Sequence, residues 1–371
     1  MFIVYNHKSK IYLKGGSALL ELLSEKQNVW DVLANTDKPI AVYGMGNGSQ
    51  RIIETIERFG GKVSEVFASD DFVRGHSFLG HKVLKYSQVC EKYDDFIVVL
   101  GFASHLDDVI ENIKRINSQH PVYAPDVPVA GSGLFTIDYV RENEEKFDFV
   151  YSRLADEESR RVYLSILNYK ISGKIHYLIA TFCDKEEVYR SILKLSQNET
   201  IVDMGAYDGD TIREFLSFTD GKYDRIYALE PDAKNYKKLL ANTQGMENVF
   251  LYNVGAWHKK DTLIFDKKAG RNSKLSSKGV AVSVTDIDSL IDSPVTMLKM
   301  DIEGSELHAL KGAEKTIRKY RPKLYVCAYH RNEDLFSLPE KILDIYDGYK
   351  IYFRHSRYIP AWECNFYCTA D

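Results

Sequence analysis

Short apolar runs alternate with amphipathic stretches through the second half of the chain, from Thr200 onward. The apolar runs predict five strands, at residues 200–203, 225–230, 249–254, 297–301 and 323–329. The amphipathic stretches predict helices at residues 210–218, 232–242, 304–319 and 338–346. Strands that alternate with helices in this way form parallel sheets. This half of the chain is therefore predicted to be an α/β domain.

Two further strands, at 349–354 and 363–369, end the pattern. The loop between them, 355–362, is too short for a crossover helix of a dozen or more residues, so the two strands must pair antiparallel. The predicted fold is a Rossmann-like, mostly parallel sheet closed by an antiparallel C-terminal hairpin.

The first half of the chain predicts a smaller α/β unit of the same kind. Its expected strands are 40–43, 63–67 and 96–100, and its expected helices are 51–59 and 104–117. Two glycines between Ala130 and Gly133 interrupt the pattern, and apolar positions at helical spacing follow at 162–169 and 188–195. We therefore expect a Rossmann-like domain over 1–128, a linker and helical bridge over 129–195, and a larger domain over 196–371.

The composition is that of an ordinary folded protein, with 44% hydrophobic and 27% charged residues among 371. The net charge of -4 provides no positive field for a phosphate backbone, which argues against nucleic acid as a partner. No apolar run reaches the ~18 residues of a membrane span, and no secretory signal is evident, so a cytoplasmic location is expected. The five cysteines do not form a disulfide framework.

The first strand of the larger domain leads into a glycine-containing turn with several acidic residues. The turn runs through Asp203, Gly205, Ala206, Tyr207, Asp208, Gly209 and Asp210. Gly205 is expected to let a ligand approach the backbone, and Gly209 to open the following helix. The acidic residues would repel a pyrophosphate but suit the sulfonium and amino groups of S-adenosylmethionine. The alternative is an ordinary strand-to-helix turn with an Asp cap.

The next three strand ends carry further polar groups. Glu230, followed by Pro231 and Asp232, lies 25 residues after Gly205, where an acid can accept ribose hydroxyls. The third strand ends in Asn253, Val254, Gly255 and Ala256, and the fourth in Asp301, Ile302 and Glu303. Open α/β sheets bind ligands at the carboxyl ends of their strands. Each acid also has a simpler interpretation as a helix cap or first-turn charge.

These residues resemble the FkbM family of S-adenosylmethionine-dependent O-methyltransferases. The resemblance covers residues 185–371 and rests on IVDMGAYDGDTIREF, ALEPD, LKMDIEGSELHALKGAEKTIRKYRPKL and the pair Tyr329-His330. It implies that the acidic turn and the two strand ends that follow bind the cofactor, through Asp203, Gly205, Ala206, Tyr207, Asp208, Gly209, Glu230, Pro231, Asp232, Asn253, Val254, Gly255 and Ala256. It also implies an acceptor side formed by Asp301, Glu303 and His330, with His355 and Glu363 of the closing hairpin. Relatives with an additional N-terminal domain imply a sugar or glycan hydroxyl in a bacterial pathway as the acceptor.

We expect His330 to be the general base, with Asp301 as the alternative. An unperturbed imidazole is largely neutral at neutral pH, and the strand before His330 should lie beside the strand before Asp301. No metal site is predicted. A basic segment at 267–274 is a candidate lid over an anionic acceptor.

Two other functions stay open. Gly44, Gly46 and Gly48 follow the first strand, and Asp70 and Asp71 follow the second, so the N-terminal domain could bind NAD for redox chemistry. The third glycine is not at the G-x-G-x-x-G position, which favours a structural or substrate-positioning domain. A non-catalytic scaffold of a glycan-assembly complex is the other alternative. The oligomeric state stays open, with the helical bridge as a candidate dimer surface.

Overall fold

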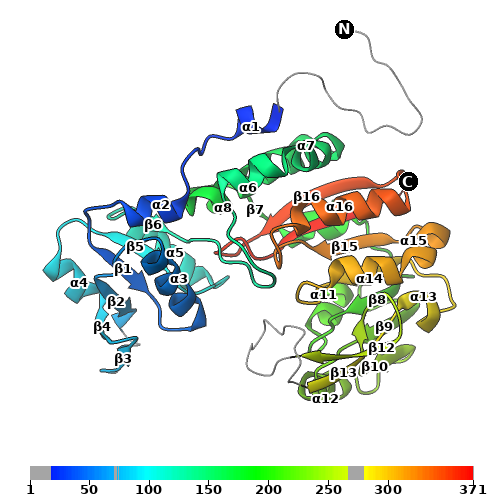
Figure 1. Cartoon of the computed structure of the whole chain (residues 1–371). Helices are drawn as coiled ribbons and strands as arrows, with labels where there is room; N and C mark the ends of the chain where they lie inside the picture. Colours follow the sequence, from blue (N-terminus) through cyan, green and yellow to red (C-terminus); the bar gives the residue numbers. More distant parts are fainter. Residues whose placement is uncertain (1–17, 71–72, 74, 266–279, 371) are drawn as a thin grey trace, which may run out of the picture.

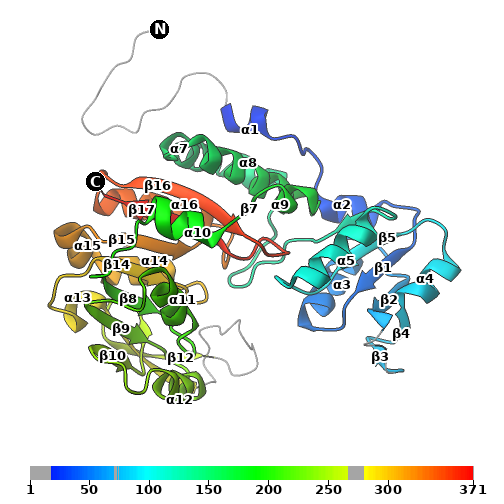
Figure 2. The same ribbon diagram turned by 180° about the vertical axis from the view of Figure 1, so that it is seen from behind.

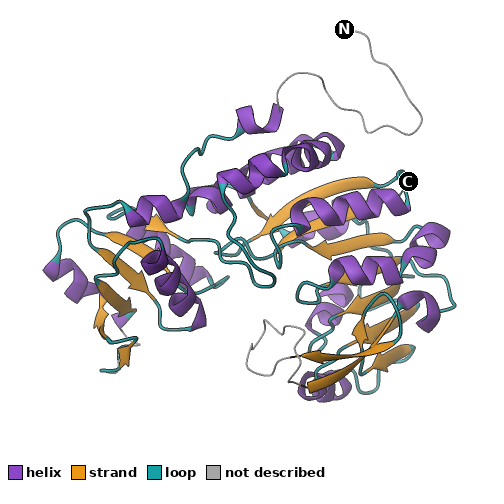
Figure 3. Cartoon of the chain, in the orientation of Figure 1, coloured by secondary structure: helices purple, strands orange, loops and turns teal. Residues whose placement is uncertain are grey.

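The computed structural model describes residues 18–70, 73, 75–265 and 280–370. The candidate lid at 267–274 and Asp71 lie outside these residues. The described chain contains two large sheets, each flanked by helices and set side by side (Figures 1 and 3). The fold is α/β with mostly parallel sheets, as predicted. Within the described residues, no helix is both long enough and apolar enough to span a bilayer.

The C-terminal sheet has eight strands in the order β10-β9-β8-β14-β15-β17-β16-β7. Its parallel strands are β8 (Thr200–Met204), β9 (Arg225–Leu229), β10 (Val249–Tyr252), β14 (Met297–Met300) and β15 (Lys323–Cys327). The chain adds β9 and β10 on one side of β8, then β14 and β15 on the other. The topological switch point therefore lies between β8 and β14, where open α/β sheets bind ligands.

The hairpin of β16 (Lys350–Ser356) and β17 (Cys364–Thr369) is antiparallel, as predicted, and β17 also pairs antiparallel with β15. The short strand β7 (Phe182–Cys183) extends the sheet by pairing parallel with β16. The sequence pattern did not predict β7, because two residues are too few to show a period.

Helix α11 (Asp210–Phe218) has the predicted boundaries, and α12 (Ala233–Asn242) and α16 (Asp334–Ile345) lie within four residues of theirs. The single helix predicted over 304–319 was wrong. It is two helices, α14 (Glu306–Gly312) and α15 (Glu314–Tyr320). A Cβ atom on Gly312 would lie 2.0 Å from the Trp257 carbonyl oxygen, so only glycine permits this close packing where α14 ends.

A separate three-stranded sheet stands beside the large one. It consists of β11 (Gly255–Ala256), β13 (Val280–Thr285) and β12 (Asp261–Phe265), in that order. The predicted third strand at 249–254 was therefore too long, because β10 stops at Tyr252 and Gly255 already pairs with Val284 of β13. A small helix, α13 (Ile287–Leu290), follows β13.

The N-terminal sheet has the order β3-β4-β2-β1-β5-β6. Its strands are β1 (Ile40–Tyr43), β2 (Glu65–Ala68), β3 (Ser77–Phe78), β4 (His81–Lys85), β5 (Ile97–Leu100) and β6 (Val122–Tyr123), with only β3 antiparallel to its neighbour. Its helices are α2 (Val29–Ala34), α3 (Asn47–Arg58), α4 (Tyr86–Lys92) and α5 (Asp107–Asn117). Strands β4, β2, β1, β5 and β6 form a parallel layer.

The chain between the two sheets folds into helices that lie over the C-terminal sheet, as Figure 2 shows from behind. They are α6 (Ile137–Glu142), α7 (Glu144–Arg153), α8 (Glu157–Ser172), α9 (His176–Ile179) and α10 (Lys185–Glu187), with α1 (Ala18–Leu22) packed on α7 and a π-helical turn at Val188–Ile192. Helix α8 packs along β16, and its Tyr169 hydroxyl donates to the Ala124 carbonyl next to β6. One continuous hydrophobic core runs through both sheets by way of this helix.

Candidate active site

The turn after β8 is shaped by two close contacts with neighbouring strands. The amides of Gly205 and Ala206 both donate to the Leu229 carbonyl of β9, at 2.9 and 3.0 Å. A Cβ atom on Gly205 would lie 1.9 Å from the Asp301 carbonyl oxygen, and Gly205 has a positive φ of 84°. Glycine is thus required at 205 by packing against the turn after β14, and not by ligand approach alone as the sequence suggested.

Gly209 is the N-cap of α11 and has a φ of 87°, so it opens the helix as predicted. Tyr207, two residues earlier, has a φ of 48° although it is not glycine. Such a conformation costs of order 1–3 kcal/mol and is concentrated at functional sites. The Tyr207 side chain is 42% exposed and stands at the rim of the turn.

Glu230 is fixed directly opposite this turn. Its Oε2 accepts from the Tyr207 amide at 2.9 Å, and its Oε1 accepts from the Asp232 amide at 2.8 Å. Burial raises the pKa of this carboxyl, although both amides act to lower it. Asn253 donates from Nδ2 to the Glu230 carbonyl at 2.8 Å, while Asp232 caps α12 by accepting from Lys234 and Asn235. The Glu230 carboxylate thus has a fixed position with lone pairs remaining for a ligand.

Below the turn, a buried lysine links two of the predicted acids. Lys299 Nζ lies 3.2 Å from Asp203 Oδ1 and 4.0 Å from Asp301 Oδ2, and donates to the Gly205 carbonyl at 3.3 Å. Burial raises the pKa of Asp203, which Lys299 opposes. Burial acts to raise the pKa of Asp301 as well, but Lys299 and His330 hold it below its usual value. Lys299 therefore ties the end of β8 to the end of β14.

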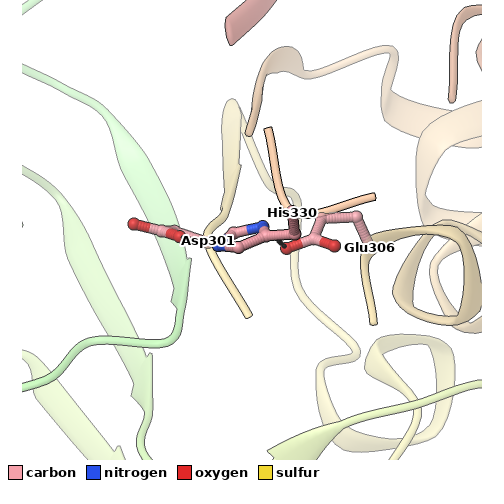
Figure 4. Close-up of side chains that lie close together, drawn as sticks. All are labelled: Asp301, Glu306 and His330. Carbon is pink, nitrogen blue, oxygen red and sulfur yellow. Dashed lines mark ion pairs between the residues drawn. The ribbon is translucent and has the colours of Figure 1, made fainter. Parts of the chain in front are cut away.

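His330 lies between Asp301 and Glu306 (Figure 4). Its Nδ1 is 3.0 Å from Glu306 Oε1, and its Nε2 is 3.4 Å from Asp301 Oδ1. Burial alone would lower the pKa of His330, but Glu306, Asp301 and Glu303 together raise it to about 10. The expectation that this imidazole is neutral at pH 7 was therefore wrong, because three carboxylates surround it.

Glu303 stands at the open side of this cluster. Its Oε2 is 3.7 Å from His330 Nε2, its side chain is 45% exposed, and its φ is 56°. Tyr329 donates from its hydroxyl to Asp301 Oδ1 at 3.1 Å. The backbone amide of Ala130, in the linker, donates to the His330 carbonyl at 2.7 Å. The segment that joins the two halves of the chain thus contacts the acceptor side predicted from the sequence.

Several predicted residues lie apart from this cluster. Asp208 pairs with Arg213 at the surface of α11, at 2.9 Å. His355 is fully buried, its Nδ1 contacts Thr181 Oγ1 at 3.0 Å, and burial lowers its pKa to about 3. Glu363 has a φ of 61°, and burial together with the Asp301 charge raises its pKa. The charge of Asp301 thus acts on Glu363 without a direct contact described between them, whereas the described contacts of His355 are elsewhere.

Residues 253–256, the last of the predicted cofactor-binding residues, are divided between two sheets. Asn253 and Val254 follow β10, while Gly255 and Ala256 form β11 and pair with β13. Pro231, which follows Glu230, accepts from Asn253 Nδ2 through its carbonyl at 3.2 Å. The turn after β9 and the turn after β10 are therefore in direct contact.

Two residues of the cluster had no assigned role in the sequence analysis. Lys299 is a lysine in the middle of a buried strand, which is itself a sign of a buried ionic partner. Glu306 begins α14, fully buried, and its Oε1 accepts from the Ile302 amide at 2.9 Å and the Gly304 amide at 3.3 Å. A Glu in the first turn of a helix is usually a surface charge. The role of Glu306 becomes visible only in the fold, where His330 lies next to it.

In the N-terminal sheet, neighbouring residues occupy the space beside the glycine turn. A Cβ atom on Gly48 would lie 2.6 Å from the Gly101 carbonyl oxygen, and Ser49 Oγ donates to that carbonyl at 3.2 Å. Asp70 is engaged by α4, where it accepts from the Tyr86 amide at 3.1 Å and from Ser87 Oγ at 3.2 Å. These contacts give both features a structural role.

The fold and the site together define the class. The C-terminal sheet is doubly wound, ends in an antiparallel hairpin, and carries acidic groups at its switch point, as in Rossmann-like methyltransferases. Residues 203–351 match the family model of the methyltransferase FkbM domain, and the chain therefore carries an FkbM-type methyltransferase domain. The resemblance found in the sequence is confirmed over this range.

Comparison with solved structures extends the likeness to nearly the whole chain. A methyltransferase FkbM from Methylobacillus flagellatus KT is 23% identical and aligns over 95% of this chain and 97% of its own, with a TM-score of 0.71. An rRNA methylase from Streptococcus thermophilus is 15% identical over 47% of this chain and 89% of its own, with a TM-score of 0.33. The first comparison shows a shared fold across both sheets. The second is too weak to support a conclusion. None of the curated proteins searched matches this chain.

Proposed function

We propose that this protein is an S-adenosylmethionine-dependent O-methyltransferase, with its methyltransferase domain over residues 196–371. The observation that carries the proposal is the position of Glu230. Two backbone amides, those of Tyr207 and Asp232, hold its carboxylate at the end of β9, facing the Gly205 turn beside the switch point. A carboxylate at the end of the second strand is placed to accept ribose hydroxyls.

The surrounding residues suit a cationic cofactor better than a pyrophosphate. Asp203 and Asp301 lie beside the same buried lysine, Lys299. Two carboxylates therefore face one ammonium group. When bound, S-adenosylmethionine would supply the methyl group of its positively charged sulfur; transfer to the acceptor oxygen would break the sulfur–methyl bond, give a methyl ether and S-adenosylhomocysteine, and pass the hydroxyl proton to water. In the proposed site, Gly205, Tyr207 and Glu230 bind the cofactor. The turn after β10 lies on the adenine side of the cofactor.

Side-chain exposure supports Asp301 as the residue that meets the acceptor. The Asp301 side chain is 29% exposed, whereas that of His330 is 1% exposed and lies behind it. We assign to Asp301 the hydrogen bond with the acceptor hydroxyl, and to His330 the orientation of Asp301. This reverses the order of the two candidates from the sequence analysis. The site then acts chiefly by aligning the hydroxyl with the methyl group.

The acceptor is proposed to be a sugar or glycan hydroxyl. The chain has an additional N-terminal sheet, and the resemblance to relatives with an additional N-terminal domain implied a glycan pathway. The test is turnover of labelled S-adenosylmethionine against a panel of free sugars, nucleotide sugars and polyols, with S-adenosylhomocysteine release as the readout. The proposal predicts release that depends on an added hydroxyl compound. Release that requires only an amine or thiol acceptor would overturn O-methylation.

A further inference from the structure

A pocket of about 270 Å³ lies between helix α3 of the N-terminal sheet and the linker, residues 127–134. We propose that this pocket binds a phosphate group of the acceptor, so that the protein methylates a sugar that is phosphorylated or linked to a nucleotide. The inference rests on the proposed function for the reaction, but the phosphate site is argued from its own residues.

The size and lining of the pocket suit one charged group of a larger molecule. Sites that enclose a whole small-molecule ligand measure about 300–1,000 Å³, and this pocket is smaller. Its lining is mostly polar and includes Arg51, Glu54, Thr55, Arg58 and Ser132. A small polar pocket of this kind can hold a substituent of the acceptor while the rest of the acceptor lies outside it.

The two arginines stand on one face of α3. Arg51 and Arg58 are seven residues apart, which is close to two turns of helix, so their side chains leave α3 in nearly the same direction. Guanidinium groups bind phosphate oxygens through paired, parallel N–H donors. Helix α3 therefore presents two phosphate-binding groups to one pocket.

Neither guanidinium group forms an ion pair with a carboxylate among the residues that the structure describes. Arg51 Nη2 donates to the Pro128 carbonyl at 2.9 Å, which uses one of its five N–H groups. Arg58 contacts the Phe59 ring, whose centroid is 6.0 Å from the guanidinium carbon. Both arginines therefore keep their charge and most of their donors for an anion.

The pocket also contains one acid, Glu54, whose Oε1 accepts from Gln50 Nε2 at 2.8 Å. Two guanidinium groups against one carboxylate leave an excess of positive charge. A phosphate monoester carries about −1.5 to −2 at pH 7 and has three acceptor oxygens, so it can use both guanidinium groups at once. A carboxylate has one charge and is satisfied by one guanidinium group. The pocket therefore suits a phosphate better than a carboxylate.

The linker connects the pocket to the acceptor side of the proposed site. Arg51 contacts the Pro128 carbonyl, and two residues later the Ala130 amide donates to the His330 carbonyl at 2.7 Å. Two residues span at most about 7 Å of chain. One acceptor molecule can therefore extend from a hydroxyl at Asp301 to a phosphate in the pocket.

The surroundings of the linker agree with this path. Helix α3 lies on the side of the N-terminal sheet that is nearer the C-terminal sheet (Figures 1 and 2). Gly131 lines the pocket, and a Cβ atom on it would lie 3.3 Å from Arg331 Nη1. Arg331 donates from Nε to the Gly304 carbonyl at 2.7 Å, and its Nη1 is 3.8 Å from Glu333 Oε1. A further guanidinium group thus stands where the pocket meets the turn after β14.

The test is calorimetric titration of the full chain with glucose 1-phosphate, uridine diphosphate and glucuronate. We expect one saturable site for a phosphate compound, and the tighter of the two shows whether the phosphate belongs to a sugar phosphate or to a nucleotide. Glucuronate, which carries a carboxylate, should bind at least about tenfold more weakly. No site for either phosphate compound, or tighter binding of glucuronate, would overturn the proposal.

Variants of the two arginines locate the site. Arg51→Gln and Arg58→Gln should each weaken phosphate binding at least about tenfold, through loss of bonds between charged groups. Arg115→Gln is the matched control, because Arg115 stands in the last turn of α5 as Arg58 does in that of α3, and its guanidinium donates to Asn112. Arg58 is exposed, so its variant should fold. Equal affinity in Arg58→Gln and Arg115→Gln would contradict the assignment.

Glu54→Gln gives a change of the opposite sign. It removes the one negative charge of the pocket and should strengthen phosphate binding about two- to fivefold. A purely structural role of this helix face predicts no gain in affinity. Weaker phosphate binding in Glu54→Gln would count against the proposal.

Titration of the same proteins with S-adenosylhomocysteine separates this inference from the proposed function. We expect equal S-adenosylhomocysteine affinity in the wild type and in Arg58→Gln. Cofactor binding without phosphate binding in the wild type contradicts only the phosphate site. Phosphate binding without cofactor binding supports the phosphate site and contradicts the methyltransferase proposal.

Discussion

The two sheets of this chain share an architecture but differ in what stands at the carboxyl ends of their strands. In the N-terminal sheet, the turn after β1 is filled by Gly101 and Ser49, and Asp70 is used to hold α4. In the C-terminal sheet, Glu230 follows β9 and Asp301 follows β14, the two strands that flank β8 and its turn. The two halves therefore share an architecture, and the proposed site lies in the half whose strand ends carry these acids.

The first prediction tests whether the halves are one folding unit. Lys170 of α8 pairs with Asp126 at 2.6 Å, and both side chains are buried. Lys170→Ala leaves an unpaired buried carboxylate and should lower the free energy of unfolding by about 3–5 kcal/mol in urea denaturation. Lys174 pairs with Glu25, and its side chain is 42% exposed. Lys174→Ala should therefore lower the free energy of unfolding by only about 0–1 kcal/mol. Equal effects would show that α8 does not join the sheets through this pair.

The second prediction compares the two glycine turns directly. Gly205→Ser should destabilise the protein by about 2–4 kcal/mol, because a Cβ atom meets the Asp301 carbonyl and φ is positive. Gly46→Ser meets no atom within 4 Å and has a φ of -99°, so it should change stability by less than about 0.5 kcal/mol. Melting temperatures of both variants decide the comparison, and a neutral Gly205→Ser would contradict the described contact.

The third prediction concerns the acceptor side. Asp301→Asn should lower kcat about a hundredfold while leaving S-adenosylhomocysteine affinity within about threefold, since Asp301 is assigned to the acceptor hydroxyl and not to the cofactor. Rates are measured with whichever hydroxyl compound the acceptor panel identifies, and Glu333→Gln serves as the control. A loss confined to KM would make Asp301 a binding residue.

The smallest expected effect is in the N-terminal sheet. Asp70→Ala removes bonds to the Tyr86 amide and the Ser87 hydroxyl, which should cost about 1 kcal/mol of stability, as for a lost helix cap. It should not alter binding of any nucleotide. Saturable binding of NAD by the wild type, lost in this variant, would assign the N-terminal sheet a cofactor after all.

The fold was accessible from the sequence because its elements follow a strong local pattern. The strands, their mostly parallel pairing and the closing hairpin followed from alternating segments and one short loop, whereas β7 and the break between α14 and α15 depend on contacts that no local pattern records. The site was accessible only in part. Glu230 and Asp301 stand at strand ends, which topology places, but the state of His330 depends on Glu306 and Glu303, which fold next to it. Neighbouring charges of this kind reverse an expectation based on an isolated imidazole.

The most direct test of the central claim is calorimetric titration of the full chain with S-adenosylhomocysteine. We predict one site in the wild type, weakened about ten- to a hundredfold in Glu230→Ala through loss of bonds to a charged acceptor, and unchanged in Glu247→Ala, an exposed acid at the opposite end of the sheet, next to β10. Circular dichroism checks that both variants fold. Equal affinity in the three proteins would remove Glu230 from the site, and no binding by the folded wild type would contradict the account.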